Sequence, residues 1–583
     1  MSPFFGATPN PDGSALFRLW APSAQPGLRL EIAGRAPLEL TPGPDGLVEI
    51  EVPQCPPGTR YAYRLGDGTR IPDPASRLQD GDVHDESVVV GDEYVWRNTR
   101  WQAPPWEQAV IYEVHAGAAG GFDGLRERLP ELAALGVNVV ELMPIADFPG
   151  PRNWGYDGVL PYAPDTAYGS PDALKHLIDC AHGLGIAVML DVVYNHFGPD
   201  GNYLPQIAKP FFREDISTPW GAAIDFRRPE VRRYFEDNAC YWLDEYRFDG
   251  LRLDAVHAIE ADDWLREFPQ RVRERLGSRR VYLVIEDDKN RASLLRAGFD
   301  AQWNDDGHHV LHHLLTGEKT SYYSDYAEEP AQILSRCLQQ GWHYQGQASV
   351  FRGGECRGEP SDDLPPSSFI WFLQNHDQTG NRALGERLRQ LCDERALCAA
   401  IAMHLLSPGI PMIFMGEEVG STAPFLYFTS HTDEALAEAV RQGRAREFSE
   451  LAKHADLPDP NAPETFERSL PWGGNGVRRA WIAYYTFLLD LRQRYLKHRL
   501  AGARSEPGRV LGPAAVQAHW RLGDGSRLII LSNLGPEPVE VPEPIPVTPY
   551  QSLQYECQSG GLAQLVGGVL LPFCTLCLIE ERP

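Results

Sequence analysis

The chain has 583 residues, more than a single hydrophobic core supports, so its length predicts two to four domains. A composition that is 43% hydrophobic and 23% charged is ordinary for a folded protein and argues against a disordered acidic tail. The formal charge of −26 argues against nucleic acid and anionic membranes as partners, because both require a basic surface.

The ends of the chain and its cysteines bear on its location. Residues 1–13 lack a basic stretch followed by an apolar core, and no run of 18 apolar residues occurs in the sequence. The ten cysteines are scattered, which favours reduced thiols, and the pair Cys574 and Cys577 lies in a stretch that reads as a terminal strand. We therefore expect a cytoplasmic protein without a membrane span, and a structural role for this C-x-x-C pair.

The N-terminal part reads as all-β. Short alternating runs at 15–22, 28–34, 47–52 and 60–65 are separated by Gly, Pro and Asp. We expect an N-terminal β-sandwich over residues 1–95, of the early-set or immunoglobulin-like kind.

A different rhythm follows, in which apolar strands alternate with helical patterns. Near-continuous apolar strands are typical of a parallel sheet covered on both faces, and eight strand-helix units predict a closed α/β barrel. The predicted helices include 123–135, 229–246 and a last one over 478–496. The predicted strands are 110–117, 137–144, 186–196, 250–257, 281–287, 299–305, 367–377 and 411–418.

Strands return after this barrel, at 516–523, 527–534 and 567–580. The overall prediction is a (β/α)₈ TIM barrel over 96–503, with loop insertions, between the sandwich and a C-terminal β domain over 504–583.

Polar side chains gather at the carboxyl ends of the predicted barrel strands, where the active sites of such barrels lie. Most of these strand ends supply a carboxylate to one face of the barrel. A single such residue could be a helix cap or a turn residue, but so many on one face favour a functional site. The residues are Asp191, Asn195, His196, Arg252, Asp254, His257, Glu286, Asp287, Asp288, Asn375, His376 and Asp377.

The segments DVVYNH (191–196), GLRLDAVH (250–257), VIED (284–287) and NHD (375–377) resemble the four signature regions of the α-amylase superfamily in order, spacing and strand placement. The resemblance covers the whole predicted barrel. It implies Asp254 as nucleophile, Glu286 as general acid/base and Asp377 as the carboxylate that stabilises the transition state. It also implies that Arg252 keeps Asp254 ionised.

These roles meet the demands of retaining glycosidases, which place two carboxyl groups ~5 Å apart. We expect crowding by Asp254 and Asp377 to raise the pKa of Glu286, so that it starts protonated. His196, His376 and Tyr156 resemble positions that bind or stack on the sugar, although Tyr156 has a core role as an alternative.

A β-sandwich before the barrel resembles the branching, debranching and trehalose-producing groups of the superfamily more than a plain α-amylase. Within these groups, the segments IYEVHAGAAGGFDGL, LMPIADFPGPRNWGYDG, IEDDKN, LQNHDQTGNRALGERL and FMGEEVGSTAPFLYFTSH resemble the family of maltooligosyltrehalose trehalohydrolases. This implies hydrolysis of the α-1,4 bond next to the terminal trehalose unit, with maltooligosyltrehalose and α-1,4-glucan oligosaccharides as substrates. Residues that could contact the substrate, or could equally be structural, are Asp191, Arg252, His257, Asp287, Asp288, Trp303, Asp305, Asp306 and Gln378.

Two other functions remain as alternatives. A 1,4-α-glucan (glycogen) branching enzyme forms the same glycosyl intermediate but transfers it to a sugar hydroxyl, and the stretch after Asp377 resembles the trehalohydrolases more. An inactive glycan-binding barrel would have lost catalytic carboxylates, whereas Asp254, Glu286 and Asp377 are all present.

No cofactor or metal is predicted. His308 with His312 and His309 with His313 have i, i+4 spacing, but no Glu lies between them in the metalloprotease pattern, so we expect a helix-surface or sugar-contact role. Asn195 resembles a position that binds calcium in many amylases, but a full set of oxygen ligands is not evident.

Overall fold

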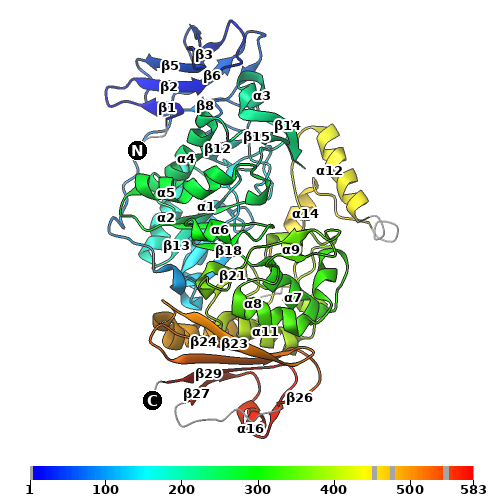
Figure 1. Cartoon of the computed structure of the whole chain (residues 1–583). Coiled ribbons are helices and arrows are strands. Elements are labelled where there is room, and N and C mark those ends of the chain that lie inside the picture. Colours follow the sequence, from blue (N-terminus) through cyan, green and yellow to red (C-terminus); the bar gives the residue numbers. More distant parts are fainter. Residues whose placement is uncertain (1–3, 219, 449–455, 473–478, 542–550, 582–583) are drawn as a thin grey trace.

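The computed structural model describes residues 4–218, 220–448, 456–472, 479–541 and 551–581. Figure 1 shows three parts stacked along the molecule, with the N-terminal sheets at one end, the barrel in the middle and the C-terminal sheet at the other end. Within the described residues no helix is both long and apolar enough to cross a membrane.

The N-terminal part is a pair of small antiparallel sheets, as expected. One sheet has the order β1-β2-β5, and the other has β4-β3-β6-β7 with β8 paired to β6. It joins the barrel through buried contacts, among them a hydrogen bond from the Tyr234 hydroxyl to the Pro74 carbonyl (2.6 Å). The strands are β1 (Gly6–Pro9), β2 (Ala15–Trp20), β3 (Arg29–Ile32), β4 (Leu38–Glu39), β5 (Leu47–Val52), β6 (Arg60–Arg64), β7 (Arg70–Ile71) and β8 (Ser87–Val88).

The prediction of an eight-stranded barrel is confirmed. All eight strands pair in parallel and close in the order β10-β13-β16-β17-β18-β21-β22-β9. Every strand residue is buried, because helices cover the outside of the barrel and side chains fill its inside. The strands are β9 (Ile111–Val114), β10 (Val139–Leu142), β13 (Ala187–Val192), β16 (Gly250–Leu253), β17 (Tyr282–Ile285), β18 (Ala301–Trp303), β21 (Phe369–Trp371) and β22 (Ile410–Phe414).

Some of the helices around the barrel begin with ordinary start signals. In α2 the Ser170 side chain accepts a hydrogen bond from the Ala173 amide, and Pro171 occupies the first turn. The helices are α1 (Gly121–Leu135), α2 (Pro171–Gly183), α3 (Leu204–Ile207), α4 (Pro229–Asp244), α5 (Asp262–Leu276), α6 (Ala292–Arg296), α7 (Asp305–Thr316), α8 (Pro330–Gln340), α9 (His376–Gly380), α10 (Leu388–Leu391), α11 (Glu394–Leu406), α12 (Glu434–Glu447), α14 (Pro463–Arg468) and α15 (Arg479–Leu491).

The last barrel helix begins at Arg479 in the structure, since Arg478 lies outside the described residues. It ends at Leu491 and continues as one turn of π-helix over Arg492–Leu496. Hairpins extend from the loops, formed by β11 (Ala146–Asp147) with β12 (Leu160–Pro164), β14 (Phe212–Thr218) with β15 (Gly221–Ile224), and β19 (Gln347–Ala348) with β20 (Cys356–Arg357).

The C-terminal part is a five-stranded antiparallel sheet in the order β23-β24-β25-β29-β27. The Thr575 hydroxyl of β29 donates to the Ala399 carbonyl of α11 (2.8 Å), so this sheet packs on the barrel through α11. Cys574 and Cys577 are buried free thiols, and an offset of three residues places them on opposite faces of β29. The strands are β23 (Arg504–Gly512), β24 (Ala515–Arg521), β25 (Arg527–Asn533), β26 (Val539–Glu540), β27 (Gln551–Glu556), β28 (Val569–Leu570) and β29 (Cys574–Glu580), with α16 (Gly561–Val566) before β28.

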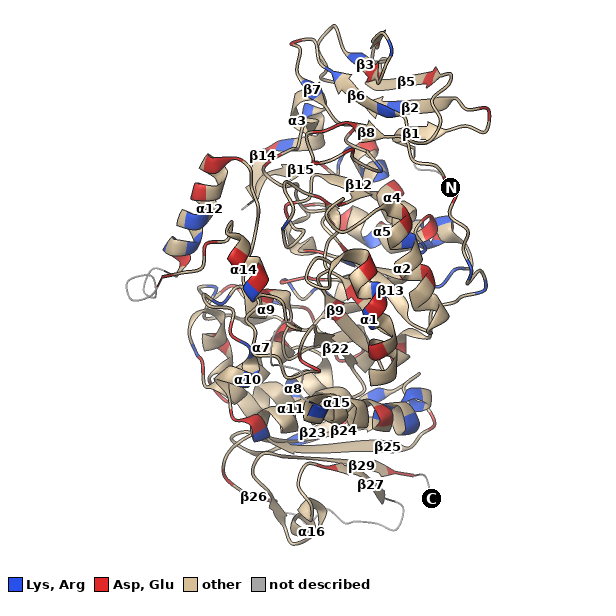
Figure 2. Cartoon of the chain, turned by 180° about the vertical axis from the view of Figure 1, so that it is seen from behind, with Lys and Arg blue, Asp and Glu red and all other residues tan. Residues whose placement is uncertain are grey.

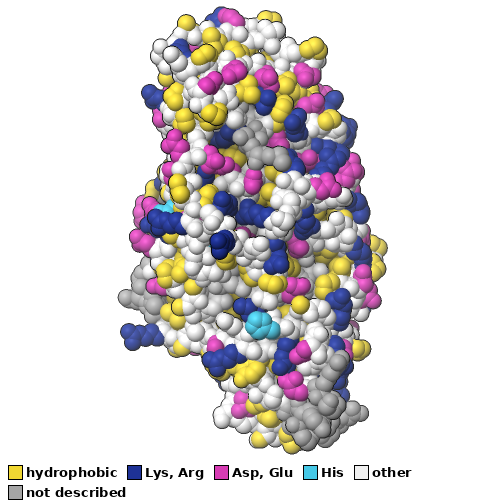
Figure 3. Space-filling view, turned by 90° about the vertical axis from the view of Figure 1, so that its left-hand side faces the viewer, with side chains coloured by type: hydrophobic (Ala, Val, Ile, Leu, Met, Phe, Trp, Pro, Cys, Tyr) yellow, Lys and Arg dark blue, Asp and Glu magenta, His cyan; other side chains and the backbone are white. Residues whose placement is uncertain are grey.

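Acidic and basic residues are mixed on the helices seen in Figure 2 and on the face seen in Figure 3.

Candidate active site

The three carboxylates that the sequence singles out lie where three barrel strands end. Asp254 directly follows β16, Glu286 directly follows β17, and Asp377 lies in the first turn of α9, after β21. The β16 and β17 strands are adjacent and in register, with Leu253 opposite Ile285, so Asp254 and Glu286 leave the barrel side by side.

Arg252 connects the carboxylates of this site. Its NH1 donates to Asp191 Oδ2 (2.6 Å) and to Asp254 Oδ1 (2.8 Å), and its NH2 donates to Glu286 Oε2 (2.8 Å). The Arg252 side chain has 0% exposure, and its guanidinium lies 4.1 Å from the centre of the Trp303 ring. A buried guanidinium is stable only when it is paired, and three carboxylates supply the pairing here.

The pKa of Glu286 in the free site is shifted in the direction opposite to the expectation. Burial raises the pKa of Asp254 well above its ordinary value despite the opposing charge of Arg252. Burial also acts to raise the pKa of Glu286, but Arg252, His257 and the Ala255 amide, which donates to Glu286 Oε2 (2.9 Å), lower it overall. Arg252 thus acts on Asp254 in the expected direction without outweighing burial, and the two carboxyl groups titrate as one coupled pair.

His376 lies beside Asp377 and is held by Glu113 of β9. Its Nδ1 contacts Glu113 Oε1 (2.5 Å), its backbone amide donates to Glu113 Oε2 (3.1 Å), and its Nε2 lies 3.6 Å from Asp377 Oδ1. Burial opposes the charge of His376, but the Glu113 and Asp377 carboxylates outweigh burial and raise its pKa to about 9.

Aromatic side chains lie next to these groups. The Tyr156 ring is stacked on the His376 ring, with centroids 5.0 Å apart, and its hydroxyl donates to Asp191 Oδ2 (2.7 Å). The His196 ring is stacked on Trp220 (4.9 Å), its Nε2 contacts the Tyr156 carbonyl (3.0 Å), and burial lowers its pKa to about 4. Trp220 keeps 46% exposure, which leaves an indole face available to a ligand.

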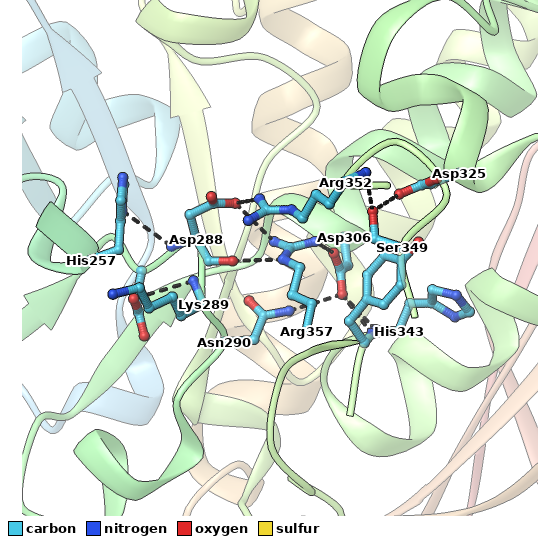
Figure 4. Close-up of polar contacts among 12 residues, drawn as sticks. His257, Asp288, Lys289, Asn290, Asp306, Asp325, His343, Ser349, Arg352 and Arg357 are labelled. Carbon is cyan, nitrogen blue, oxygen red and sulfur yellow. Dashed lines mark hydrogen bonds and ion pairs between the residues drawn. The ribbon is translucent and has the colours of Figure 1, made fainter. Parts of the chain in front are cut away.

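A second polar network forms the rim beyond Glu286 (Figure 4). Asp288 accepts from Arg352 and lies 3.5 Å from Arg357 NH2, while its backbone amide donates to His257 Nδ1 (3.4 Å). Buried Arg357 also donates to Asp306 Oδ1 (2.7 Å). The β19–β20 hairpin, which carries Arg352 and Arg357, is thereby fixed to the strand ends of β17 and β18.

Asp306 is the centre of this network and is 1% exposed. It accepts hydrogen bonds from Asn290 Nδ2 (3.0 Å), the Tyr326 hydroxyl (2.6 Å), and the backbone amides of His343 (2.8 Å) and Tyr344 (2.9 Å). Four separate segments therefore depend on one carboxylate.

Two of the predicted substrate contacts have structural partners instead. Both carboxylate oxygens of Asp287 accept from Arg291, and the Asp287 side chain has 0% exposure. Trp303 is 1% exposed and packs against Arg252. Both side chains are therefore buried against structural partners, Asp287 against Arg291 and Trp303 against Arg252.

Asp305 and Gln378 are half-buried beside the carboxylates. Burial and the neighbouring Glu286 raise the pKa of Asp305 well above its ordinary value. Gln378 Oε1 accepts from the Tyr322 hydroxyl (3.1 Å). Both side chains stay available as substrate contacts.

The histidines of α7 are placed differently from the helix-surface expectation. His308, His309 and His312 are buried, because the 3₁₀ helix Ser321–Tyr326 covers them with tyrosine rings. His312 stacks on Tyr323 (4.4 Å) and pairs with Glu318 (2.8 Å). Among the described residues, no group of three or more His, Cys, Asp or Glu side chains could hold a metal ion.

The sequence reasoning missed several residues of this site. Glu113 and Glu141 are buried carboxylates in otherwise apolar strands, a contrast with their neighbours that could have identified them. Trp220, Arg352 and Arg357 lie in hairpins that are separated from the signature segments along the chain, and their sequence gave no such signal.

The chain is similar to known carbohydrate enzymes. Residues 77–215 match the family described as alpha amylase, catalytic domain, and residues 503–558 match a domain of unknown function, DUF3459. Malto-oligosyltrehalose trehalohydrolase of Deinococcus radiodurans is 39% identical over 559 residues, covering 92% of this chain and 90% of the relative. The same enzyme of Saccharolobus solfataricus is 39% identical over 504 residues, covering 84% and 87%.

The fold is also shared with a solved structure. A Salmonella typhimurium protein assigned to the α-amylases superposes with a TM-score of 0.93 at 41% identity, and the match covers 100% of both chains. A 1,4-alpha-glucan branching enzyme of Corynebacterium jeikeium is 35% identical, but that match covers only 44% of this chain and 40% of the relative.

Proposed function

Because the chain belongs to the malto-oligosyltrehalose trehalohydrolase family of α-amylase-type glycosidases, we propose that it hydrolyses the α-1,4-glucosidic bond next to the terminal trehalose unit of maltooligosyltrehalose. The products are trehalose and a shortened maltooligosaccharide. One observation carries the residue assignment: a single buried guanidinium, Arg252, contacts both Asp254 and Glu286 at the ends of adjacent strands.

In the proposed reaction Asp254 attacks the anomeric carbon while Glu286 protonates the leaving glycosidic oxygen. Water then attacks the glycosyl-enzyme with Glu286 as base, so the anomeric configuration is retained. Asp377 and His376 bind hydroxyl groups of the same sugar, and these contacts strengthen as positive charge develops on the ring. Asp191, Arg252 and Tyr156 hold Asp254 in position.

The reaction needs ionised Asp254 and protonated Glu286. A bound sugar replaces water around Glu286 and thereby raises its pKa, while the developing positive charge at the anomeric carbon favours ionised Asp254. We propose that substrate binding in this way prepares the acid and the nucleophile together.

The rim network supports the choice of substrate. We propose that the segments fixed by Asp288, Asp306 and Arg357 shape the subsites for the trehalose end, together with His257, Asp305 and Gln378. His196 and the exposed face of Trp220 are proposed to contact the glucan part, because an indole face suits the apolar face of a pyranose.

The branching-enzyme alternative is less well supported, because its similarity covers under half of the chain. An inactive binding protein is disfavoured by the buried Arg252, which keeps two carboxylates next to each other at the ends of β16 and β17. We also propose a cytoplasmic location, since all ten cysteines are free thiols, as in a reducing compartment.

Product analysis tests the proposal. The purified protein is incubated with maltooligosyltrehalose and, separately, with the reducing maltooligosaccharide of the same length, and the products are resolved by chromatography. We expect rapid release of trehalose from the first substrate and slow cleavage of the second. Branched or elongated products, or equal hydrolysis of both substrates, would contradict the proposal.

A further inference from the structure

Glu113 is a buried carboxylate inside the barrel whose two oxygens both contact one residue, His376. Oε1 lies 2.5 Å from His376 Nδ1, and Oε2 accepts the His376 backbone amide at 3.1 Å. Both side chains have 1% exposure. The contact therefore fixes the rotation of the imidazole ring as well as its distance from the barrel wall.

This fixed ring directs its second nitrogen at the active site. His376 Nε2 lies 3.6 Å from Asp377 Oδ1, and Tyr156 stacks on the ring face. If the ring is protonated, Nε2 carries a hydrogen and donates toward Asp377 or a sugar hydroxyl. If the ring is neutral with its hydrogen on Nδ1 toward Glu113, Nε2 is only an acceptor, and it then faces the Asp377 carboxylate unfavourably.

The structure contains its own comparison for the effect of Glu113. His115 lies on the chain just after β9, is also 1% exposed, and its Nε2 contacts a carbonyl, that of Asn153 (2.8 Å), in place of a carboxylate. Burial lowers the pKa of His115 to about 4, whereas that of His376 is raised to about 9. These two equally buried histidines thus have pKa shifts of opposite direction, and the Glu113 carboxylate is the contact that distinguishes His376 from His115.

Other charged groups also act on His376. They come from the strands around it and from its own turn, and they are Glu113, His115, Glu141, Asp191, Arg252, Glu286 and Asp377. Of these, Glu113 is the carboxylate in direct contact with Nδ1, and Arg252 opposes the charge of the ring.

We propose that Glu113 is a positioning residue of the reaction, which keeps His376 protonated and turns its Nε2–H toward Asp377 and the sugar. Glu113 itself does not reach the substrate. The inference rests on the proposed function and deepens it. Glu113, a residue of the first barrel strand outside the signature segments, sets the pH above which sugar binding and turnover fall.

The test is the pH dependence of kcat/KM and kcat for the wild type and Glu113→Gln. For the wild type we expect activity to fall as pH rises through about 9, where His376 loses its proton. Glu113→Gln keeps the size and can still accept one hydrogen bond, but it removes the charge, so the alkaline limb should move down by about 2 pH units. Glu113→Asp, which restores the charge, should move the alkaline limb part of the way back toward its wild-type position.

A matched control is available at the other end of the barrel. Asp249, just before β16, pairs with His182 at 2.8 Å, and both side chains have 1% exposure. Asp249→Asn therefore removes an equally buried carboxylate from a histidine outside the site. We expect it to lower stability without moving the alkaline limb.

A folded Glu113→Gln variant with the wild-type alkaline limb would overturn the inference. If that variant does not fold, His376→Asn decides, because it should abolish the limb near pH 9, and a limb that persists overturns the inference equally. Calorimetry of maltotetraose binding between about pH 7 and about pH 10 measures the same loss of a proton as a fall in affinity, without turnover. Failure of the proposed reaction would leave this binding limb intact, so the two failures are distinguishable.

Discussion

The guanidinium of Arg252 lies 4.1 Å from the centre of the Trp303 ring. The indole face is thereby placed against a cation whose other contacts are the carboxylates of Asp191, Asp254 and Glu286. A cation over an aromatic face in a buried site contributes about 2 kcal/mol, so Trp303 stabilises the charge that holds the nucleophile and the acid in place.

Trp303→Leu should therefore lower kcat by a factor on the order of 10, with little change in KM, because it weakens the position of Arg252 and leaves the surface that faces the sugar unaltered. Trp303→Phe, which keeps an aromatic face, should retain more activity than Trp303→Leu. Steady-state kinetics of both variants on maltooligosyltrehalose measure this, and equal activities for the two would show that the cation contact is unimportant.

Asp254→Asn should abolish turnover by a factor on the order of 10³ or more while the fold is kept, because the amide cannot attack the anomeric carbon. Kinetics and thermal unfolding of the same preparation check both parts. Near wild-type activity in this variant would remove Asp254 from the role of nucleophile.

Asp147 in β11 provides a test of stability against pH. It is 1% exposed and its Oδ2 has no hydrogen-bond partner. Burial and the nearby Asp165 raise the pKa of Asp147 well above its ordinary value, and burial raises that of Asp165 to about 7. Because the folded state holds these protons more tightly than the unfolded state does, stability falls as pH rises from the ordinary carboxyl range through about 7.

Asp147→Asn removes one of the two acids. The thermal midpoint of this variant at about pH 8 should exceed that of the wild type by roughly 2 °C, and the difference should shrink toward about pH 4. Thermal unfolding across this range is the measurement. A variant that is less stable than the wild type at the higher pH would contradict the prediction.

Arg357→Lys tests the rim. Lysine cannot reproduce the fork that joins Asp306 to the Asp288 carbonyl (2.6 Å), so the β19–β20 hairpin should loosen. We expect a rise in KM for maltooligosyltrehalose of about 10-fold, a smaller rise for the reducing maltooligosaccharide, and nearly unchanged kcat. Equal effects on both substrates would argue against a role of this hairpin in selecting the trehalose end.

Much of the fold was accessible from the sequence, because each barrel strand is an apolar run whose polar residues come at its carboxyl end. The positions of Asp254, Glu286 and Asp377 at those ends follow from this pattern, and the signature segments add their proposed roles. The same pattern could not show that Asp287, unlike Glu286, points away from the site toward a structural partner. Adjacent residues at a strand end point in different directions, and the partner that buries Asp287, Arg291, comes from the loop that follows.

Other features depended on contacts between distant segments. The α7 histidines have the polar character of a helix surface, yet the helix Ser321–Tyr326 folds over them. The lowered pKa of Glu286 depends in part on a backbone amide, that of Ala255, and residue types alone do not predict such a contact.

The position of β29 between β25 and β27 has a consequence for synthesis on the ribosome. β29 is an interior strand of the C-terminal sheet and is made after the other four, so β25 and β27 cannot be joined until residue 580 has left the exit tunnel. Until then the part of α11 that contacts β29 lacks this cover, although the barrel strands are already complete. The nascent chain should therefore depend most on chaperones until β29 has been translated, and a ribosome stalled before β29 should release a barrel that aggregates.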